Sequence, residues 1–310
     1  MRNKNGNQFK VSIFILTYNQ EKFISQTLES VLNQKTNFDY QLVIGEDQST
    51  DSTRVICERF ASENPLKVKL LPSLGQNIGL IKNYVRTIKE CDGKYIAICD
   101  GDDYWIDEFK LQKQCDFLEN NPDFSIVYSR VKLLFNDGSQ REWFPLMKKK
   151  DTQFEDLIFA NHIPSVSSMF KNIQDNTNEL PSWILKYPFG DWQTYLWTIK
   201  NGGKIHLLNE VTAVYRKDSG ISSELKRIKS NMIKTNINIL EDLFKDSEFA
   251  SKREVTSQAL INLRRNLVSS YNREFKYNKG FIQFLKNIKQ TGVNISELKI
   301  YLYSIYKSLV

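Results

Sequence analysis

The sequence predicts an α/β fold with a mostly parallel central sheet flanked by helices and followed by a helical extension. Over the first hundred residues, short runs rich in β-branched residues alternate with segments of helical periodicity. Beyond residue 222 the apolar residues follow only the helical period. Because strand–helix–strand units place strands parallel through right-handed crossovers, the alternating part should form one open sheet.

The expected strands are short apolar runs separated by segments long enough for a helix. Residues 11–17 (VSIFILT) are the clearest run, since β-branched side chains favour a strand that is buried on both faces. After a turn signal at Asp137-Gly138 the pattern is less regular up to about residue 188. Further strands are expected at 40–46, 68–71, 94–100 and 125–135, and helices at 21–33, 53–61, 81–90 and 107–121.

Length and composition exclude several classes of protein. A chain of 310 residues with 41% hydrophobic and 25% charged residues can bury a large core, so disordered and collagen-like classes are excluded. Four cysteines without CxxC spacing and two histidines do not suit a zinc site. No apolar run is long enough to span a membrane, and the first ten residues are polar, so we expect a cytoplasmic protein.

The net charge of +7 is unevenly distributed along the chain. Residues 221–310 hold 16 Lys and Arg against 8 Asp and Glu, a balance of +8. The remaining 27 basic and 28 acidic residues give residues 1–220 a balance of −1. A protein that binds nucleic acid with its main fold usually carries positive charge on that fold, so we expect no nucleic-acid partner.

Polar residues follow three of the expected strands. Thr17 and Asn19 end the first, Glu46 and Asp47 end the second, and residues 100–103 (DGDD) end the fourth. In open α/β sheets, ligands bind beyond the carboxyl ends of the strands. These residues are therefore the first candidates for a binding site.

The DGDD segment places several carboxylates within one tight turn. Hard divalent cations take oxygen ligands, and Mg²⁺ commonly binds one or two carboxylates together with substrate phosphates, while Mn²⁺ accepts the same ligands. Gly101 would allow the backbone to approach a ligand closely. An EF-hand calcium loop is excluded because Tyr104 and Trp105 stand at its fifth and sixth positions. Taken alone, the segment could also be an acidic turn that caps the helix beginning near Asp107.

Four ordered blocks of sequence resemble glycosyltransferase family 2, the inverting nucleotide-sugar transferases of GT-A fold. The resemblance covers about residues 10–222. It implies a nucleotide-sugar-binding half at residues 1–105 and an acceptor-binding half at 106–222. The periodicity and charge of residues 223–310 predict a basic amphipathic helical extension after them. The blocks are VSIFILTYNQEKFISQTLESVLNQ, VIGEDQSTDST, NIGLIKNYVRTIKECDGKYIAICDGDDYW and FGDWQTYLWTIKNGGKIHLLNEVTAVYRKDSG.

The resemblance implies a role for each matching residue of the donor side. Asp102 would hold the Mg²⁺ or Mn²⁺ that bridges the diphosphate, and Asp100 would meet the ribose or a metal-bound water. Gly101 and Asp103 would adjoin the sugar or the metal. Thr17 and Asp47 would surround the nucleotide base, with Asn19 and Glu46 nearby, and Lys82 and Asn83 would approach the diphosphate or the sugar.

On the acceptor side the resemblance implies that Asp191 is the catalytic base. His162 and Trp192 fall where relatives place acceptor-side residues. Relatives often carry a metal-binding His where this chain has Asp218, which could itself bind the cation or bind nothing.

Each of these positions also has a purely structural interpretation. Asp47 could cap the turn that follows it through Ser49 and Thr50, and Asp191 could be the N-cap of a helix at 192–200. Thr17 could be an ordinary strand residue and Lys82 a solvated helix residue. His162 could be structural, and we interpret His206 as structural.

The resemblance therefore implies a metal-dependent inverting glycosyltransferase. It would move a sugar from a nucleoside diphosphate, expected to be UDP, to a hydroxyl of a glycan or lipid-linked acceptor in surface polysaccharide or lipopolysaccharide synthesis. One alternative is a catalytically silent relative that binds nucleotide sugars. Another is a nucleotidyltransferase that makes them, although the expected Gly-rich loop is missing after the first strand. A phospho-accepting regulator would need neither the DGDD block nor the block around Asp191.

The basic extension has two interpretations. Apolar residues share helical faces around 232–244 and 281–288, which is typical of amphipathic helices. Such helices could contact the inner face of the plasma membrane, since basic residues attract anionic lipid. They could instead pack on the catalytic domain or on a second subunit of a homodimer.

Overall fold

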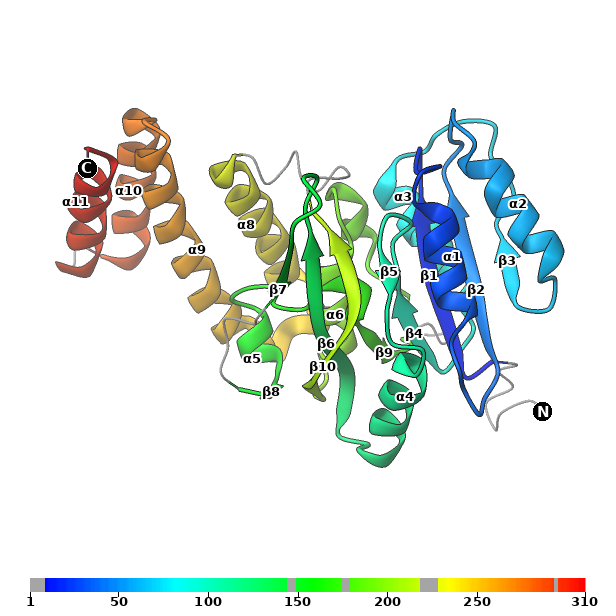
Figure 1. Cartoon of the computed structure of the whole chain (residues 1–310). Coiled ribbons are helices and arrows are strands. Elements are labelled where there is room, and N and C mark those ends of the chain that lie inside the picture. Colours follow the sequence, from blue (N-terminus) through cyan, green and yellow to red (C-terminus); the bar gives the residue numbers. More distant parts are fainter. Residues whose placement is uncertain (1–8, 144–148, 174–178, 218–227, 293–294, 310) are drawn as a thin grey trace. The chain divides into compact units, whose positions relative to one another are not determined.

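The computed structural model describes residues 9–143, 149–173, 179–217, 228–292 and 295–309. The chain forms two compact units (Figure 1). The first comprises Met1–Leu157 and Asn161–Ser219, and the second comprises Ile158–Ala160 and Gly220–Val310. The first unit contains the sheet and the second is built from helices.

The first half of the sheet is parallel, as the sequence predicts. Its strands lie in the order β3-β2-β1-β4, and every neighbouring pair is parallel. The crossover helices lie between consecutive strands of the chain, so the carboxyl ends of β1, β2 and β4 share one edge. The strands are β1 (Val11–Thr17), β2 (Tyr40–Glu46), β3 (Val68–Leu70) and β4 (Tyr95–Ile98), and the helices are α1 (Ile24–Leu32), α2 (Thr53–Glu63) and α3 (Leu80–Lys89).

The second half of the sheet mixes directions. It continues β4-β9-β6-β10-β5, where β9 is antiparallel to both β4 and β6, and β10 is parallel to β6. The fold class is confirmed, and the antiparallel strand β9 is one of the elements that periodicity did not predict. The elements are β5 (Tyr104–Trp105), α4 (Lys110–Asn120), β6 (Phe124–Leu134), β7 (Gln140–Trp143), β8 (Asp151–Thr152), α5 (Phe154–Leu157), η1 (Ser165–Ser167), β9 (Met169–Lys171), η2 (Ser182–Lys186), α6 (Asp191–Thr198) and β10 (Lys204–Arg216).

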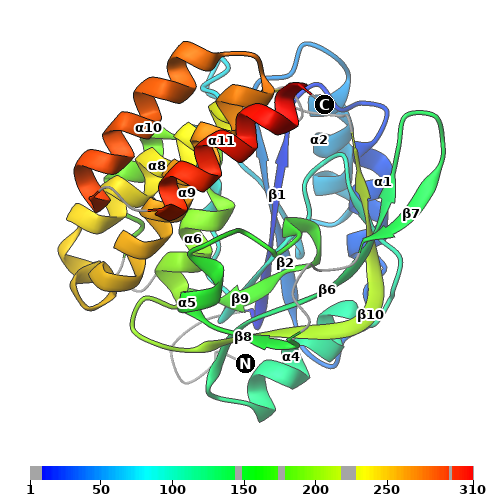
Figure 2. The ribbon, with the colours of Figure 1, turned by 90° about the vertical axis from the view of Figure 1, so that its left-hand side faces the viewer.

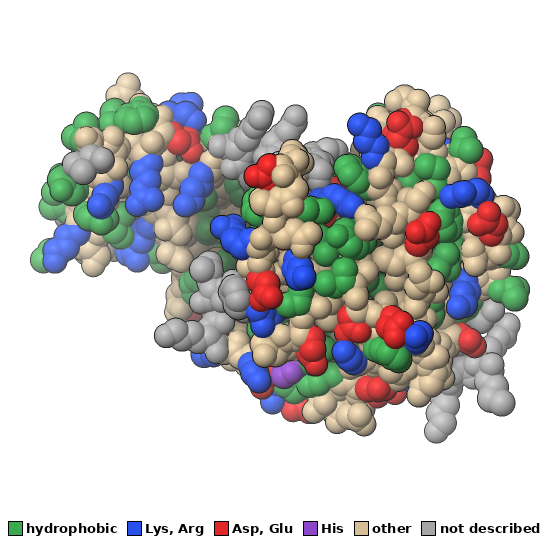
Figure 3. All heavy atoms as spheres, viewed as in Figure 1, with side chains coloured by type: hydrophobic (Ala, Val, Ile, Leu, Met, Phe, Trp, Pro, Cys, Tyr) green, Lys and Arg blue, Asp and Glu red, His purple; other side chains and the backbone are tan. Residues whose placement is uncertain are grey.

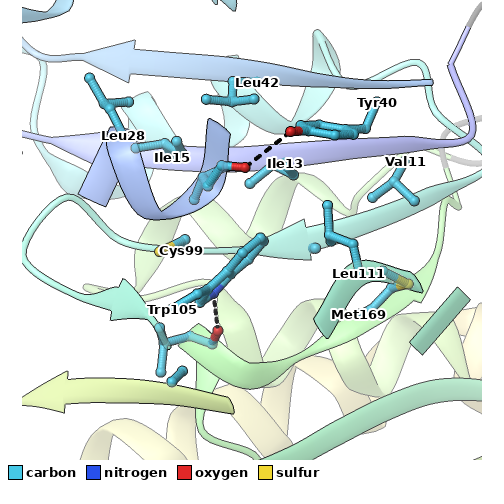
Figure 4. Packing of buried hydrophobic residues seen from close by; sticks show 14 of the residues in the cluster. Val11, Ile13, Ile15, Leu28, Tyr40, Leu42, Cys99, Trp105, Leu111 and Met169 are labelled. Carbon is cyan, nitrogen blue, oxygen red and sulfur yellow. Dashed lines mark hydrogen bonds between the residues drawn. The ribbon is translucent and has the colours of Figure 1, made fainter. Parts of the chain in front are cut away.

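The core of this unit lies on both faces of the sheet. All seven residues of β1 and of β2 are buried, which explains why these runs are apolar on both faces. Figure 4 shows Ile13 and Ile15 beside Leu28 of α1 and Leu42 of β2. Two polar groups enter this core already paired: the Trp105 indole donates to the carbonyl of Val166 at 2.8 Å, and the Tyr40 hydroxyl donates to the carbonyl of Val31 at 3.2 Å.

The second unit is an assembly of helices, which confirms the helical extension. Helix α9 (Arg253–Arg273) packs against α8 (Lys229–Lys245), α10 (Tyr277–Thr291) and α11 (Ile295–Leu309), with a short turn η3 (Ser247–Lys252) before it (Figure 2). Among the described residues, no helix has both the length and the apolar character needed to cross a bilayer.

Lys110 is buried in the first unit next to an aromatic ring. Its ammonium lies 4.0 Å from the centre of the Trp105 ring and donates to Oε1 of Gln114 at 2.9 Å. Burial lowers the pKa of this lysine from 10.5 to about 7. Between these two pH values the Lys110 side chain is protonated in the unfolded chain but neutral in the folded protein. Lys110 therefore destabilises the fold most below pH 7, and this destabilisation decreases as the pH rises.

We expect Lys110→Met to have a higher free energy of unfolding than the unsubstituted protein at pH 6.5. This difference between the two proteins should shrink by roughly 2–4 kcal/mol by pH 9.5. Urea titrations of both proteins at the two pH values measure this difference. Lys113→Met, one turn along the same helix and exposed, is the control and should change by less than about 0.5 kcal/mol. A difference in free energy of unfolding that did not vary with pH would contradict the lowered pKa of Lys110.

Candidate active site

The loops after β1 and β2 are joined by hydrogen bonds. The backbone N–H of Asn19 donates to Oγ of Ser49 at 2.9 Å, and the N–H of Thr50 donates back to Oδ1 of Asn19 at 2.8 Å. The N–H of Gln20 donates to Oγ1 of Thr53 at 2.8 Å. Asn19 has a φ of 52°, a left-handed conformation that asparagine tolerates better than most residues. These hydrogen bonds hold the loops after β1 and β2 in a fixed position relative to one another.

Glu46 and Asp47 are buried and both hold backbone N–H groups. Glu46 accepts from the N–H of Ser49 at 2.6 Å. The two oxygens of Asp47 accept from the N–H groups of Ile78 and Gly79, each at 2.9 Å. Asp47 therefore anchors the segment that leads into α3, whereas the turn through Ser49 is held by Glu46. Both carboxylates shape the wall of the site at the end of β2.

The DGDD turn after β4 is fixed to β1 and α1. The hydroxyl of Thr27 donates to the carbonyls of Gly101 at 3.0 Å and of Asp103 at 2.6 Å, and it is buried. The N–H of Gly101 donates to the carbonyl of Leu16 at 2.8 Å. A Cβ at position 101 would lie 2.8 Å from Oγ1 of Thr17 and closer still to the side chain of Gln20, so the turn requires glycine here.

Negative charge accumulates in this turn. Burial, together with the negative charges of Asp102 and Asp191, raises the pKa of Asp100 to about 7. Burial also raises the pKa of Asp103, whose Oδ1 accepts from the N–H of Arg216 at 2.8 Å. Its Oδ2 is buried and has no hydrogen-bond partner among the described residues. The Arg216 guanidinium donates to the carbonyl of Asp102, which ties β10 to the same turn.

These carboxylates suit a divalent cation that the protein shares with a ligand. Three acids within one partly buried turn repel one another, and a bound cation would relieve that repulsion. Within the part of the chain that the structure describes, no group of three or more His, Cys, Asp or Glu side chains forms a ready cage for a metal. The arrangement fits Mg²⁺ or Mn²⁺ held by one or two carboxylates and by ligand phosphates, with Asp102 and Asp100 as the available donors.

Asp191 reaches the same site from a distant part of the sequence. It is the first residue of α6, after the cap residue Gly190, and its Oδ2 accepts from Nδ2 of Asn161 at 2.9 Å. Its charge raises the pKa of Asp100 and, after the larger effect of burial, that of Tyr84. The Tyr84 hydroxyl donates to Oγ1 of Thr194 one turn along α6 at 3.0 Å, which fixes the start of this helix.

Three residues of the site were not found by sequence reasoning. Thr27 holds the DGDD turn, Asn161 donates to Asp191, and Arg216 contacts the turn from β10. Asn161 had a local signal, since it precedes His162 in the sequence. Thr27 and Arg216 each make two hydrogen bonds to the turn across long sequence separations, which no local pattern encodes.

The remaining expected site residues occupy varied positions. Lys82 is exposed, and buried Asn83 donates to the carbonyl of Gly45 at 2.7 Å. His162 is buried, with Nε2 3.1 Å from Oγ1 of Thr152, and the buried Trp192 indole donates to the carbonyl of Leu157 at 2.9 Å. These contacts give His162 and Trp192 packing roles within the first unit. Asp218 lies outside the described residues.

Comparisons with known proteins find a matching family and proteins of similar fold. A family model described as Glycosyl transferase family 2 matches residues 12–175. An uncharacterized protein of Mycobacterium tuberculosis is 32% identical over 209 residues, which make up 67% of this chain and 58% of that protein. This chain thus spans less than two thirds of the length of that relative.

Two solved structures share the fold. TarS, the poly(ribitol-phosphate) β-N-acetylglucosaminyltransferase of Staphylococcus aureus, was solved as residues 1–349 with UDP-GlcNAc. It matches with a TM-score of 0.59 and 19% identity, over 97% of this chain and 80% of that one. The mannosyltransferase PcManGT of Pyrobaculum calidifontis, solved with GDP-Man and Mn²⁺, matches with a TM-score of 0.60 and 14% identity, over 97% and 81%.

We expect Thr27→Val to destabilise the protein by about 1–3 kcal/mol, because the near-isosteric change leaves the carbonyls of Gly101 and Asp103 without their buried donor. Urea unfolding at neutral pH measures the loss. Thr235→Val, which removes one hydroxyl that bonds within α8, is the control and should change stability by less than about 0.5 kcal/mol. Equal effects of the two substitutions would show that Thr27 does not hold the turn.

Proposed function

Because the chain belongs to glycosyl transferase family 2, we propose that it is a metal-dependent inverting glycosyltransferase. The proposed donor is a sugar linked to a nucleoside diphosphate, with UDP as the nucleotide. The proposed acceptor is a hydroxyl of a glycan or lipid-linked glycan used in surface polysaccharide or lipopolysaccharide synthesis. The observation that carries this proposal is the gathering of the Asp100, Asp102 and Asp191 carboxylates, whose charges act on one another.

Asp191 is the proposed general base. A hydroxyl nucleophile has a pKa far above 7, so a carboxylate that takes its proton during attack accelerates the reaction, typically by 10²–10⁴-fold. Nδ2 of Asn161 binds one oxygen of Asp191 and so orients the carboxylate. The side chain is only half-buried, so an acceptor can reach it. A single displacement by that hydroxyl inverts the anomeric carbon.

Asp102 is the proposed metal ligand on the donor side. When bound, the cation would neutralise negative charge on the departing diphosphate as a Lewis acid. Asp100 lies close enough to Asp102 and Asp191 for their negative charges to raise its pKa. Because of this raised pKa, Asp100 can hold a proton near neutral pH when no cation is present. Protonated, it can donate a hydrogen bond to a ribose or a water; ionised, it can add an oxygen ligand.

We propose that one half of the first unit binds the donor and the other half binds the acceptor. We assign donor binding to residues 1–105, where the joined loops after β1 and β2 form a shaped wall through Asn19, Glu46 and Asp47. We assign acceptor binding to residues 106–222, which supply Asp191 and Asn161. Lys82, exposed in the first turn of α3, is the proposed contact of the diphosphate.

Two alternative functions are less well supported. A silent nucleotide-sugar-binding protein would not need an oriented carboxylate at Asp191, which here accepts a hydrogen bond from Asn161. A nucleotidyltransferase would need a flexible Gly-rich phosphate loop after β1. The loop here runs through Asn19 and Gln20 and is bonded to the loop after β2.

Replacing either acid should separate its role from the other's. We expect Asp191→Asn to lower donor hydrolysis and transfer by at least about 100-fold while donor binding persists, because only proton removal is lost. Asp102→Asn should weaken metal-dependent donor binding as well as turnover. The measurements are UDP release from UDP-sugars with Mn²⁺ and calorimetric donor binding.

Asp123→Asn is the matched control for these variants, since Asp123 is exposed and far along the chain from both acids. It should retain full turnover. Turnover of Asp191→Asn close to that of the unsubstituted protein would remove the base assignment, and unchanged Mn²⁺ dependence of Asp102→Asn would remove the metal assignment.

A thermal-shift series should identify the nucleotide. We expect UDP-sugars with Mn²⁺ or Mg²⁺ to raise the melting temperature, because a donor at 100 times its dissociation constant adds about 2.7 kcal/mol of stability. GDP- and dTDP-sugars should shift it less, and chelation with EDTA should abolish the shift. A larger shift with GDP- or dTDP-sugars would contradict the choice of UDP, and no shift with any donor would contradict donor binding itself.

A further inference from the structure

Helix α11 in the second unit presents an apolar surface to solvent. Ile295 is 73% exposed, Leu302 is 55% exposed and Leu309 is 72% exposed. At 100° per residue the exposed apolar side chains of this helix fall on one side of it. They are Ile295, Leu298, Leu302, Tyr303, Tyr306 and Leu309.

The side of the same helix that faces α9 is largely polar, while Tyr301 beside it stacks on Phe284 of α10. Buried Glu297 accepts from Nε of Arg265 on α9 at 2.7 Å, and buried Ser304 accepts from Nδ2 of Asn272 on α9 at 2.7 Å. Amphipathic helices on globular proteins normally point their apolar stripe inward and their polar face outward. Helix α11 is reversed, so its exposed apolar side needs an explanation beyond the packing of this unit.

Helix α10 continues this surface. Phe281, Ile282 and Leu285 are 46%, 54% and 49% exposed. The ring of Phe281 lies 6.0 Å from the ring of Tyr301 on α11, which places the two helices in direct contact at this point. We name the exposed apolar residues of α10 and α11 together the outer face. Contiguous exposed apolar patches of this kind mark interaction sites.

The exposed charged residues of α10 and α11 are all basic. Between Tyr277 and Leu309 the sequence contains five lysines and one acid. The acid, Glu297, is 2% exposed and is paired with Arg265. Lys307 lies 5.9 Å from the ring centre of Tyr303 and 6.0 Å from that of Tyr306. Figure 3 shows basic and hydrophobic side chains next to one another over these helices. The five exposed lysines are Lys279, Lys286, Lys289, Lys299 and Lys307.

We propose that the outer face docks on the surface of an anionic lipid bilayer. Apolar side chains would enter the boundary between headgroups and acyl chains, tyrosines would lie at the headgroup level, and lysines would extend to lipid phosphates. A second copy of the chain fits less well, because an isologous interface would place lysines of one copy against lysines of the other. The proposal concerns the helical unit and stands whichever donor the first unit takes.

Co-sedimentation of the full chain with vesicles tests this proposal. Vesicles of phosphatidylcholine alone are compared with vesicles containing three parts in ten of phosphatidylglycerol, at low and high salt and without any sugar donor. We expect stronger binding to the anionic vesicles and weaker binding at high salt. Lys299→Gln with Lys307→Gln should lower the partition coefficient by about 30-fold, at about fivefold for each lysine.

Removing apolar surface should have a comparable effect. We expect Leu298→Ser with Leu302→Ser to lower vesicle binding by at least about tenfold with no change in melting temperature, since both leucines are exposed. Leu66→Ser, at a leucine that is 87% exposed in the first unit, and Lys150→Gln are the matched controls and should bind as the unsubstituted protein does.

Three results would overturn the proposal. One is equal binding, or none, to the two kinds of vesicle. Another is a loss of binding in the controls as large as in the outer-face variants. The third is a dimer by sedimentation velocity that the Leu298→Ser, Leu302→Ser variant converts to a monomer without any vesicle binding, which would assign the outer face to a second copy. None of these results depends on turnover, so they leave the glycosyltransferase proposal to its own tests.

Discussion

Repulsion among carboxylates is the constraint around which the first unit is organised. Asp100, Asp102 and Asp103 lie within one turn, and burial raises the pKa values of Asp100 and Asp103. The negative charge of Asp191 also raises the pKa of Asp100. The turn keeps this shape because its backbone carbonyls accept hydrogen bonds from two sides, from the buried hydroxyl of Thr27 and from the guanidinium of Arg216. The stability of neighbouring elements thus keeps together side chains that would otherwise separate, which is typical of sites prepared for a cation or a developing charge.

The elements predicted best from sequence are those that local physics determines. The strands at 11–17 and 40–46 match to the residue because both faces are buried and the runs are rich in apolar residues. Strand β9 has three residues and pairs antiparallel with strands that precede it by dozens of positions, so no periodicity reveals it. The site divides in the same way: acids at strand ends are visible in the sequence, while their partners depend on long-range hydrogen bonds. Asp47 shows this, since its oxygens bind the segment at 78–79 and not its own turn.

In the helical unit, helical periodicity alone does not predict which apolar side chains are buried. The sequence places Phe281, Phe284 and Leu285 on one apolar face of a helix, and such a face is expected to pack inward. In the structure Phe284 is buried and stacks on Tyr301 with ring centres 4.5 Å apart, whereas Phe281 and Leu285 are exposed. Periodicity identifies the amphipathic helix, but the neighbouring helix decides which edge of its apolar arc is covered.

The polar contacts between α11 and α9 explain why the reversed orientation of α11 is stable. Removing Glu297 from water is unfavourable unless it is paired, and the guanidinium of Arg265 supplies that pair at 2.7 Å. Turning α11 over would bury its leucines, but it would break the two hydrogen bonds that Arg265 and Asn272 donate to this helix. The orientation is therefore set by specific polar pairing, and exposure of the apolar side is its consequence. A helix held in this way offers its leucines, tyrosines and lysines to an external surface without any rearrangement of the unit that carries it.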